Sequence, residues 1–304
     1  MSYDYEEVKK TQDAALKVLM HFKYLCEKYC LKYFAIGGTC IGAIRHKGFI
    51  PWDDDIDVAM PVDDYYRFID LCQTELKYPY EIITPNNIRH YSSMYIKLQD
   101  VSTTFIDSFA ADYSDRYSGI YIDIFPLYGL PESKAEQEKI IRRNEMLKKI
   151  NLKLRFPLLS EYRIKGRIIW LLLIPLRQIV PFYWATDKQQ ELFKNFQFYF
   201  SEKIYFPWRA VPGSIGSGTY KNVFYYEDFS QAIEVPFEDT TIAVPIGYDR
   251  YLTMDFGDYM TLPPETSRMP GHPKAIVDLD RPFAYYKELK EKENDDYWLH
   301  NRSI

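Results

Sequence analysis

The first forty-five residues combine a helical pattern with a short strand pattern. Apolar side chains recur every three or four residues between about positions 5 and 30, which predicts an amphipathic helix. The run Tyr33–Ile36 is aromatic and β-branched, so it predicts a strand that ends where Gly37-Gly38 lets the backbone turn sharply. Thr39 is then expected to cap a short helix that extends to about Arg45.

An acidic run leads directly into a second strand pattern. Because side chains alternate along a strand, Asp55 and Asp57 should point the same way, while Ile56 and Val58 point into the core. Two residues at about 3.3 Å each place the two acidic Cα atoms roughly 6–7 Å apart. Carboxylates at this spacing can share Mg²⁺ or Mn²⁺, because hard oxygen ligands favour these cations over zinc. Asp53 is expected in the preceding turn.

The next seventy residues read as one helix followed by strands. Asp63 is the expected N-cap of a helix that ends near Leu76. Short strands are predicted at 81–83, 94–98, 103–106 and 119–125. Asp123 is the lone charge in the last of these runs, so it is predicted to bring a third carboxylate from a neighbouring strand. A mixed sheet of about five strands results.

The second half of the chain alternates apolar, basic and polar stretches. The pattern predicts, in order, a basic helix at 131–154, an apolar segment at 164–184, an aromatic helix at 189–206, a Gly/Ser loop at 212–218, antiparallel strands within 224–246, a short helix at 247–256 and a surface tail after Pro270. We therefore expect a catalytic core at 1–130, a helical insertion at 131–212, and a C-terminal part, 213–304, that completes the core.

The apolar segment Ile164–Trp184 is a poor transmembrane span. Its longest uncharged stretch before Arg177 is the nine residues Ile168–Leu176, far short of the roughly 20 that a bilayer requires. Pro175 and Pro181 also interrupt it. A core helix and a segment lying in the membrane interface remain as alternatives.

Charge is distributed unevenly along the chain. The net charge is −5, which gives no indication of a nucleic-acid partner, yet the stretch from Lys139 to Arg177 alone carries +9. The basic and apolar region 139–184 is therefore expected to contact anionic lipid peripherally. The acidic N-terminus lacks the apolar core of a signal peptide, so we expect a cytoplasmic protein, peripheral on the inner face of the plasma membrane.

Four blocks of the sequence together resemble the LicD family of phosphotransferases, of which fukutin and its relative are distant cousins. The blocks are Gly37–Thr39, Arg45–Asp57, Tyr121–Leu127 and Phe256–Met260. A strand, a Gly-Gly turn, a helix and a second strand with Asp-x-Asp are also the signature of the nucleotidyltransferase fold. The resemblance therefore implies an α/β (α+β) fold: a nucleotidyltransferase-like mixed sheet flanked by helices, with a helical insertion.

The resemblance also implies an activity and a set of partners. A phospho-alcohol, phosphocholine in the family, would pass from a CDP-linked donor such as CDP-choline to a hydroxyl of a cell-surface glycan, releasing CMP. The acceptor would be a lipid-linked or soluble precursor of teichoic acid or lipopolysaccharide. Asp55, Asp57 and Asp123 are the expected catalytic and metal-binding residues, with Asp123 completing the metal cage or accepting the acceptor's proton.

Several basic and small residues are expected to bind the donor nucleotide. Gly37, Gly38 and Thr39 would place a short helix N-terminus at its phosphates, and positive charge at Arg45, His46 and Lys47 would stabilise phosphate oxygens. His46 is equally consistent with an ordinary loop residue. Arg268 and His272 are further candidates, because their stretch matches the family's end region; the alternative for both is an exposed tail.

Two other classes of function fit parts of the sequence. A nucleotidyltransferase that adds a nucleoside monophosphate to a small molecule would use the same three carboxylates but release pyrophosphate. A catalytically inactive membrane-surface scaffold would need no metal, and the intact acidic set argues against it. The two enzyme classes differ in the product released.

Overall fold

The computed structural model describes residues 5–108, 111, 113–155, 180–196, 198–205, 223–270 and 274–292. Its longer helices are α1 (Tyr5–Lys28), α2 (Gly37–Ile41), α3 (Val62–Glu75), α4 (Lys134–Arg155), α6 (Trp184–Phe193), α7 (Tyr248–Phe256) and α8 (Phe283–Lys292). A π-helical turn spans Gly42–His46, and single 3₁₀ turns span Ser114–Arg116, Phe198–Phe200, Tyr226–Phe229 and Glu265–Ser267. The strands are β1 (Phe34–Ala35), β2 (Asp57–Pro61), β3 (Tyr80–Ile83), β4 (Ile96–Asp107), β5 (Ser118–Gly129), β6 (Lys203–Tyr205), β7 (Val223–Tyr225), β8 (Ala232–Phe237), β9 (Thr240–Pro245) and β10 (Lys274–Asp278).

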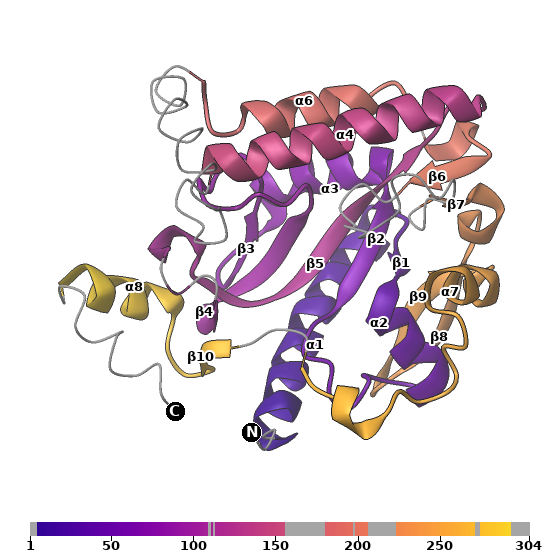
Figure 1. Ribbon diagram of the computed structural model, residues 1–304. Coiled ribbons are helices and arrows are strands. Elements are labelled where there is room, and N and C mark those ends of the chain that lie inside the picture. The colour runs from indigo at the N-terminus through magenta and orange to yellow at the C-terminus, as the bar shows by residue number, and fades with distance from the viewer. Residues whose placement is uncertain are drawn as a thin grey trace.

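A mixed sheet organises the molecule and confirms the expected α/β class (Figure 1). Its main path runs β1-β2-β5-β4-β10, and β2 and β5 are parallel, whereas the other pairs are antiparallel. β3 pairs with the first half of β4, and β6 and β7 extend the far end of β5. β5 is buried along its whole length, so the sheet's central strand is covered on both faces.

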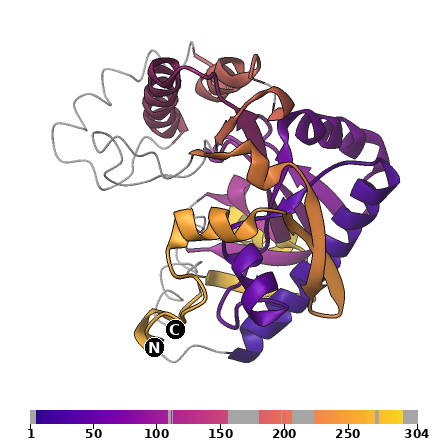
Figure 2. The ribbon, with the colours of Figure 1, turned by 90° about the vertical axis from the view of Figure 1, so that its right-hand side faces the viewer.

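Two helices cover one face of this sheet. The aromatic ring of Phe22 on α1 meets that of Phe68 on α3 edge-on, with 5.2 Å between centroids, and both side chains are fully buried. Burying a side chain of this size stabilises the fold by roughly 1.5–3 kcal/mol. The helix predicted for the first thirty residues is thus confirmed. Its apolar residues recur every three or four positions because α1 presents one apolar stripe to the sheet. The β8–β9 hairpin stands beside β1 (Figure 2).

The helices α4 and α6 form a separate layer, side by side above the sheet (Figure 1). Buried polar side chains lie between them. The Asn144 side-chain amide donates to the Tyr205 hydroxyl at 3.1 Å, and the Gln189 amide donates to the side-chain Oδ1 atom of Asn144 at 2.9 Å. Because an unpaired polar group would be costly at this depth, these bonds fix how the two helices align.

The structure corrects the aromatic helix expected at Gln189–Phe206. The helix there is α6, which ends at Phe193, and β6 follows, antiparallel to the end of β5 at Tyr128 and Gly129. The aromatic residues of this stretch suit a strand and a helix equally, and the open edge beyond β5 decides in favour of a strand.

Two further predictions are corrected along β4. The strands expected at 94–98 and 103–106 are one strand, which continues through an irregularity between Asp100 and Phe105. The stretch after Pro270 is more than a surface tail, because β10 pairs with the last residues of β4 and α8 lies against that strand. The edge that β10 covers would otherwise expose unpaired backbone groups.

Several expectations fall on residues outside the described ranges. Positions 156–179 cover most of the apolar segment, and 206–222 include the Gly/Ser loop. The membrane contact through 139–184 and the division at 130 and 212 therefore stay predictions. Among the helices that the structure describes, none combines the length and the apolar character needed to cross a bilayer.

Candidate metal and phosphate site

Three adjacent strands carry the central charges of the site in one row. Asp57 on β2 pairs with Asp123 on β5 in parallel register, and Asp123 pairs with Lys97 on β4. Residues that are directly opposite across a sheet project from the same face, so two carboxylates and one ammonium converge there. This register agrees with the expectation that Asp123 lies on a strand next to the acidic run.

Asp55 joins this row from the loop before β2. The strand begins at Asp57, two residues later than the alternation argument assumed. Even so, carboxylate oxygens of Asp55, Asp57 and Asp123 all lie within 4.8 Å of one another. A second group with the same spacing is formed by Asp53, Asp54 and Asp55.

The acidic loop is fixed in place by the first helix. The buried Gln12 on α1 donates through its amide to the carbonyl oxygens of Asp53 at 2.7 Å and Ile50 at 3.3 Å. Within the loop, the Asp53 N–H donates to the Ile50 carbonyl at 2.9 Å. The turn before the strand is therefore held from outside as well as by its own backbone.

Electrostatics at Asp57 favour a bound cation. Burial raises the pKa of Asp57 well above its usual range, and the neighbouring carboxylates Asp55, Asp123 and Asp53 raise it further. Its Oδ1 atom is buried, and no described residue gives it a hydrogen bond. An orphaned buried carboxylate oxygen within a set of three carboxylates fits a hard divalent cation such as Mg²⁺ or Mn²⁺.

The glycine turn closely approaches these carboxylates. Gly37 has a φ of +55°, and a Cβ atom on Gly38 would stand 2.3 Å from the Asp53 Oδ2 atom. A side chain at position 38 would force the Asp53 carboxylate to move, and the positive φ at position 37 favours glycine there. The turn is also anchored from behind, because the Gly37 N–H donates to the Tyr251 hydroxyl at 3.0 Å.

The helix expected from Thr39 to Arg45 has different bounds and a different start. α2 begins at Gly37, ends at Ile41 and continues into the π-helical turn Gly42–His46. Thr39 does not cap it, because the Thr39 hydroxyl accepts the Asp57 N–H at 2.8 Å instead. Thr39 thus ties the glycine turn to the first residue of β2.

Arg45 and His46 form a pair turned toward the C-terminal part of the chain. The Arg45 guanidinium donates to the Tyr259 carbonyl at 2.5 Å and to the His46 Nε2 atom at 2.9 Å. Burial and the adjacent Arg45 lower the pKa of His46, so its imidazole is neutral at pH 7. This contact joins two of the blocks that carry the family resemblance. A role for either residue in binding the donor stays a prediction.

The tip of the β8–β9 hairpin braces the loop that begins at Lys47. The exposed Lys47 has a φ of +58°, and its carbonyl accepts the Glu238 N–H at 2.9 Å. The Glu238 carboxylate accepts the Phe49 N–H at 3.0 Å and the Lys9 ammonium at 3.1 Å. Glu238 carries no local signal in the sequence, because its role depends on a contact across 189 residues.

Arg268 lies against the start of the acidic loop. Its guanidinium donates to the Pro263 carbonyl at 2.9 Å and stands 5.6 Å from the centroid of the Trp52 ring, directly before Asp53. His272 lies outside the described residues. The expected donor-binding role of both residues stays a prediction.

Lys97 is the residue of the site that sequence reasoning missed. Its Nζ atom is 2.9 Å from the Asp123 Oδ1 atom and 3.2 Å from the centroid of the Tyr121 ring. Lys97 stands between the apolar residues Ile96 and Leu98 at the start of β4, which is a signal that it faces away from them. Locating it beside Asp123 requires the pairing of β4 with β5, which the local pattern does not contain.

One wall of the site is the loop between β3 and β4. The Tyr95 ring packs at a tilt of 45° against that of Phe125, with 4.3 Å between centroids, and Phe125 lies two residues beyond Asp123. Burial, and after it the charge of Asp123, raises the pKa of Tyr95. The Tyr91 hydroxyl donates to the Tyr95 carbonyl at 3.1 Å. Aromatic side chains therefore close the carboxylate face against water on this side.

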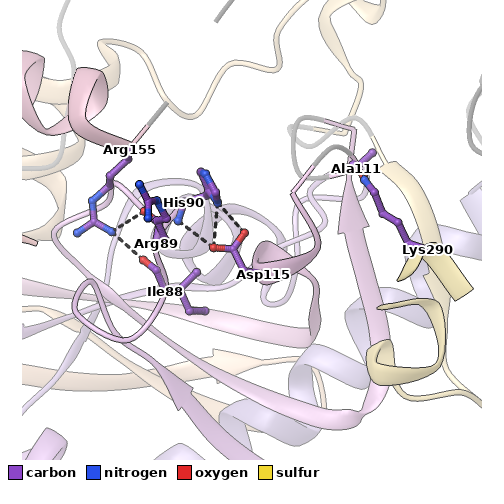
Figure 3. Close-up of polar contacts among 7 residues, drawn as sticks. All are labelled: Ile88, Arg89, His90, Ala111, Asp115, Arg155 and Lys290. Carbon is purple, nitrogen blue, oxygen red and sulfur yellow. Dashed lines mark hydrogen bonds and ion pairs between the residues drawn. The ribbon is translucent and has the colours of Figure 1, made fainter. Parts of the chain in front are cut away.

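The same loop is anchored at its outer end by two charged residues (Figure 3). The fully buried Arg155 of α4 donates to the carbonyls of Ile88 at 2.7 Å and Arg89 at 3.1 Å. Asp115 accepts the His90 N–H at 3.1 Å and contacts its imidazole Nδ1 at 2.8 Å. The helical layer is thus connected to the wall of the site.

The sequence is also similar to known proteins. The family described as LicD/FKTN/FKRP, nucleotidyltransferase domain, matches residues 31–166. The lipopolysaccharide cholinephosphotransferase LicD of Haemophilus influenzae is 35% identical over 266 residues, which cover 87% of this chain and 96% of that protein. An uncharacterised protein of Rickettsia prowazekii is 37% identical over 65 residues, 19% of this chain and 24% of its own length.

Proposed function

Because the chain belongs to the LicD family, we propose that it is a transferase that moves phosphocholine from a CDP-linked donor to a hydroxyl of a lipopolysaccharide-type glycan, releasing CMP. The phosphocholine and the lipopolysaccharide follow the relative from Haemophilus influenzae, whose name states both. The observation that carries the proposal is the set Asp55, Asp57 and Asp123, with oxygens within 4.8 Å of one another beside the glycine turn.

The three carboxylates would hold the divalent cation. When bound, this ion would neutralise charge on the donor's pyrophosphate and lower the barrier to loss of CMP. Asp123 would complete the ligand set or accept the proton of the attacking hydroxyl; its position opposite Asp57 in the sheet supports either role.

For the rest of the reaction, the protein would position the donor and the acceptor and would form no covalent bond with either. In-line attack requires the acceptor oxygen, the phosphorus and the leaving oxygen to be aligned. Gly37 and Gly38 add no side chain of their own to the side of the site where the donor's phosphates would lie, next to the Asp57 and Asp53 carboxylates. Tyr95 and Phe125 shield the opposite side from water.

Incubation with CDP-choline, Mg²⁺ and a lipopolysaccharide acceptor tests the proposal. We expect CMP and choline-labelled glycan to form in equal amounts and no pyrophosphate to appear. A nucleotidyltransferase of the same fold would instead consume a nucleoside triphosphate and release pyrophosphate. Pyrophosphate release, or no CMP with any CDP-alcohol (choline, ribitol or glycerol), would refute the proposal.

We further propose that the region 139–184 brings the protein to anionic membranes, where lipid-linked acceptors reside. The support is its sequence, in which basic residues flank an apolar segment, and each basic residue near an anionic surface contributes about 1 kcal/mol. We expect flotation with anionic vesicles at low salt and release at about 1 M salt, where the Debye length shrinks to about 3 Å. Equal flotation with neutral vesicles, or none at any salt, would contradict it.

A further inference from the structure

Lys97 lies where a positive charge would serve two purposes: it would pair with Asp123 when no metal is bound, and it would stabilise a phosphate oxygen when the metal is bound. Its ammonium is 2.9 Å from the Asp123 carboxylate, and both side chains are largely buried, at 14% and 6% exposure. The Tyr121 ring lies under the same ammonium at 3.2 Å, and an aromatic face attracts a cation without neutralising it. Tyr121 and Asp123 lie on one face of β5, two residues apart, so both side chains contact the same ammonium group.

The charges of the site indicate what this ammonium does when a metal ion is present. Three ionised carboxylates carry −3, and a divalent cation with Lys97 would balance them. An ion coordinated by Asp123 would weaken that residue's hold on Lys97, since the same oxygens would then face a stronger positive charge. Lys97 would be free to turn to the next anion, while Tyr121 keeps its ammonium near the row.

Two other candidate cations are engaged elsewhere. The Arg45 guanidinium donates to the Tyr259 carbonyl, and that of Arg268 donates to the Pro263 carbonyl and faces Trp52. Lys97, by contrast, is in ion-pair contact with a carboxylate of the proposed metal set. Of these three cations, Lys97 is the one that contacts the carboxylates beside which a phosphate would bind.

We propose that Lys97 is a catalytic residue that exchanges partners: it pairs with Asp123 in the metal-free protein and donates to a phosphate oxygen of the donor once a divalent cation is bound. This inference rests on the proposed phosphotransfer. No bond is made or broken in this exchange, because Lys97 only moves its ammonium from an ion pair with a carboxylate to a phosphate oxygen, whose negative charge it stabilises in the transition state.

The test is a pair of measurements on Lys97→Met that should move in opposite directions. Calorimetric titration with Mn²⁺ alone should show affinity higher by about tenfold, because a competing positive charge next to the carboxylates is gone. Turnover with CDP-choline should fall by roughly a hundredfold, the usual effect of removing one charge-stabilising donor. Lys97→Arg should recover part of the turnover and restore Mn²⁺ affinity toward that of the wild type.

Lys203→Met is the matched control. Lys203 also stands over a tyrosine ring, with its Nζ atom 3.0 Å from the Tyr225 centroid, but it lies on β6, outside the row of carboxylates. This change should leave Mn²⁺ affinity as it is. If Lys97→Met folds poorly, Lys97→Gln carries the same two expectations, because it is neutral and polar.

The outcomes separate this inference from the proposed function. Mn²⁺ affinity that is unchanged or weaker in the neutral Lys97 variants, or turnover within about threefold of wild type, would overturn the role of Lys97 while wild-type CMP release still stands. Wild-type protein that binds no Mn²⁺ and releases no CMP would instead overturn the proposed function, and this inference with it.

Discussion

Asp57→Asn is expected to abolish phosphotransfer and, at the same time, to make the protein more stable. The change keeps the side chain's size but removes the charge at the centre of the carboxylate row. Loss of a metal ligand should lower turnover by at least about a thousandfold, equivalent to roughly 4 kcal/mol of barrier.

The gain in stability follows from the sign of the pKa shift. The pKa of Asp57 is raised in the folded state by burial and by Asp55, Asp123 and Asp53. A raised pKa means that ionisation costs free energy in the folded protein, so stability falls as the pH rises through that pKa. The neutral asparagine removes this cost, and we expect about 1 kcal/mol of added stability at pH 8 without metal, shrinking toward acidic pH.

Thermal unfolding in a metal chelator and a CMP-release assay measure the two effects. Asp70→Asn, an exposed acid on α3, is the matched control and should change neither. If Asp57→Asn kept more than about a tenth of wild-type turnover, a loss of only some 1.4 kcal/mol, the assignment of Asp57 to the metal would be wrong.

Arg155→Met should destabilise the protein by about 3 kcal/mol and lower the midpoint of thermal unfolding by roughly 5 °C. Burial lowers the pKa of Arg155 to about 10, yet its guanidinium is satisfied by the carbonyls of Pro85, Ile88 and Arg89 and by the Thr186 hydroxyl. Methionine fills the space but leaves these acceptors unpaired.

The same variant should also slow turnover several-fold, because the loop held by Arg155 leads to Tyr91 and Tyr95 beside the carboxylates. Arg142→Met, at an exposed position of the same helix with one weak ion pair to Glu138 at 3.8 Å, serves as the control. A midpoint shift under about 1 °C for Arg155→Met would show that the buried guanidinium does not hold the loop.

The local sequence pattern was sufficient to pick out Asp57 and Asp123 as neighbouring carboxylates. It was not sufficient to locate Lys97 and Glu238. Asp57 and Asp123 are recognisable because each is a charge at the start of, or inside, an apolar strand run, and adjacent strands bring them together. Lys97 and Glu238 depend on strand register and on a hairpin contact, which arise only when distant segments pack.

Burial shows that one of the counted charges does not lie at the surface. Arg155 contributes to the basic excess between Lys139 and Arg177, yet it is fully buried and acts as an internal anchor. The aromatic stretch from Gln189 was expected to be helical, and its last residues joined the sheet because β5 offered an unpaired edge. In both cases a tertiary partner, absent from the local pattern, decided the outcome.

The position of the metal ion is the most direct test of the account. Anomalous diffraction at the manganese edge, from crystals grown with Mn²⁺ and CMP, would locate the ion relative to both acidic groups. We predict one strong peak about 2.2 Å from carboxylate oxygens of Asp55, Asp57 and Asp123. A peak held by Asp53 and Asp54 without Asp57 and Asp123, or no peak in a crystal that shows bound CMP, would contradict it.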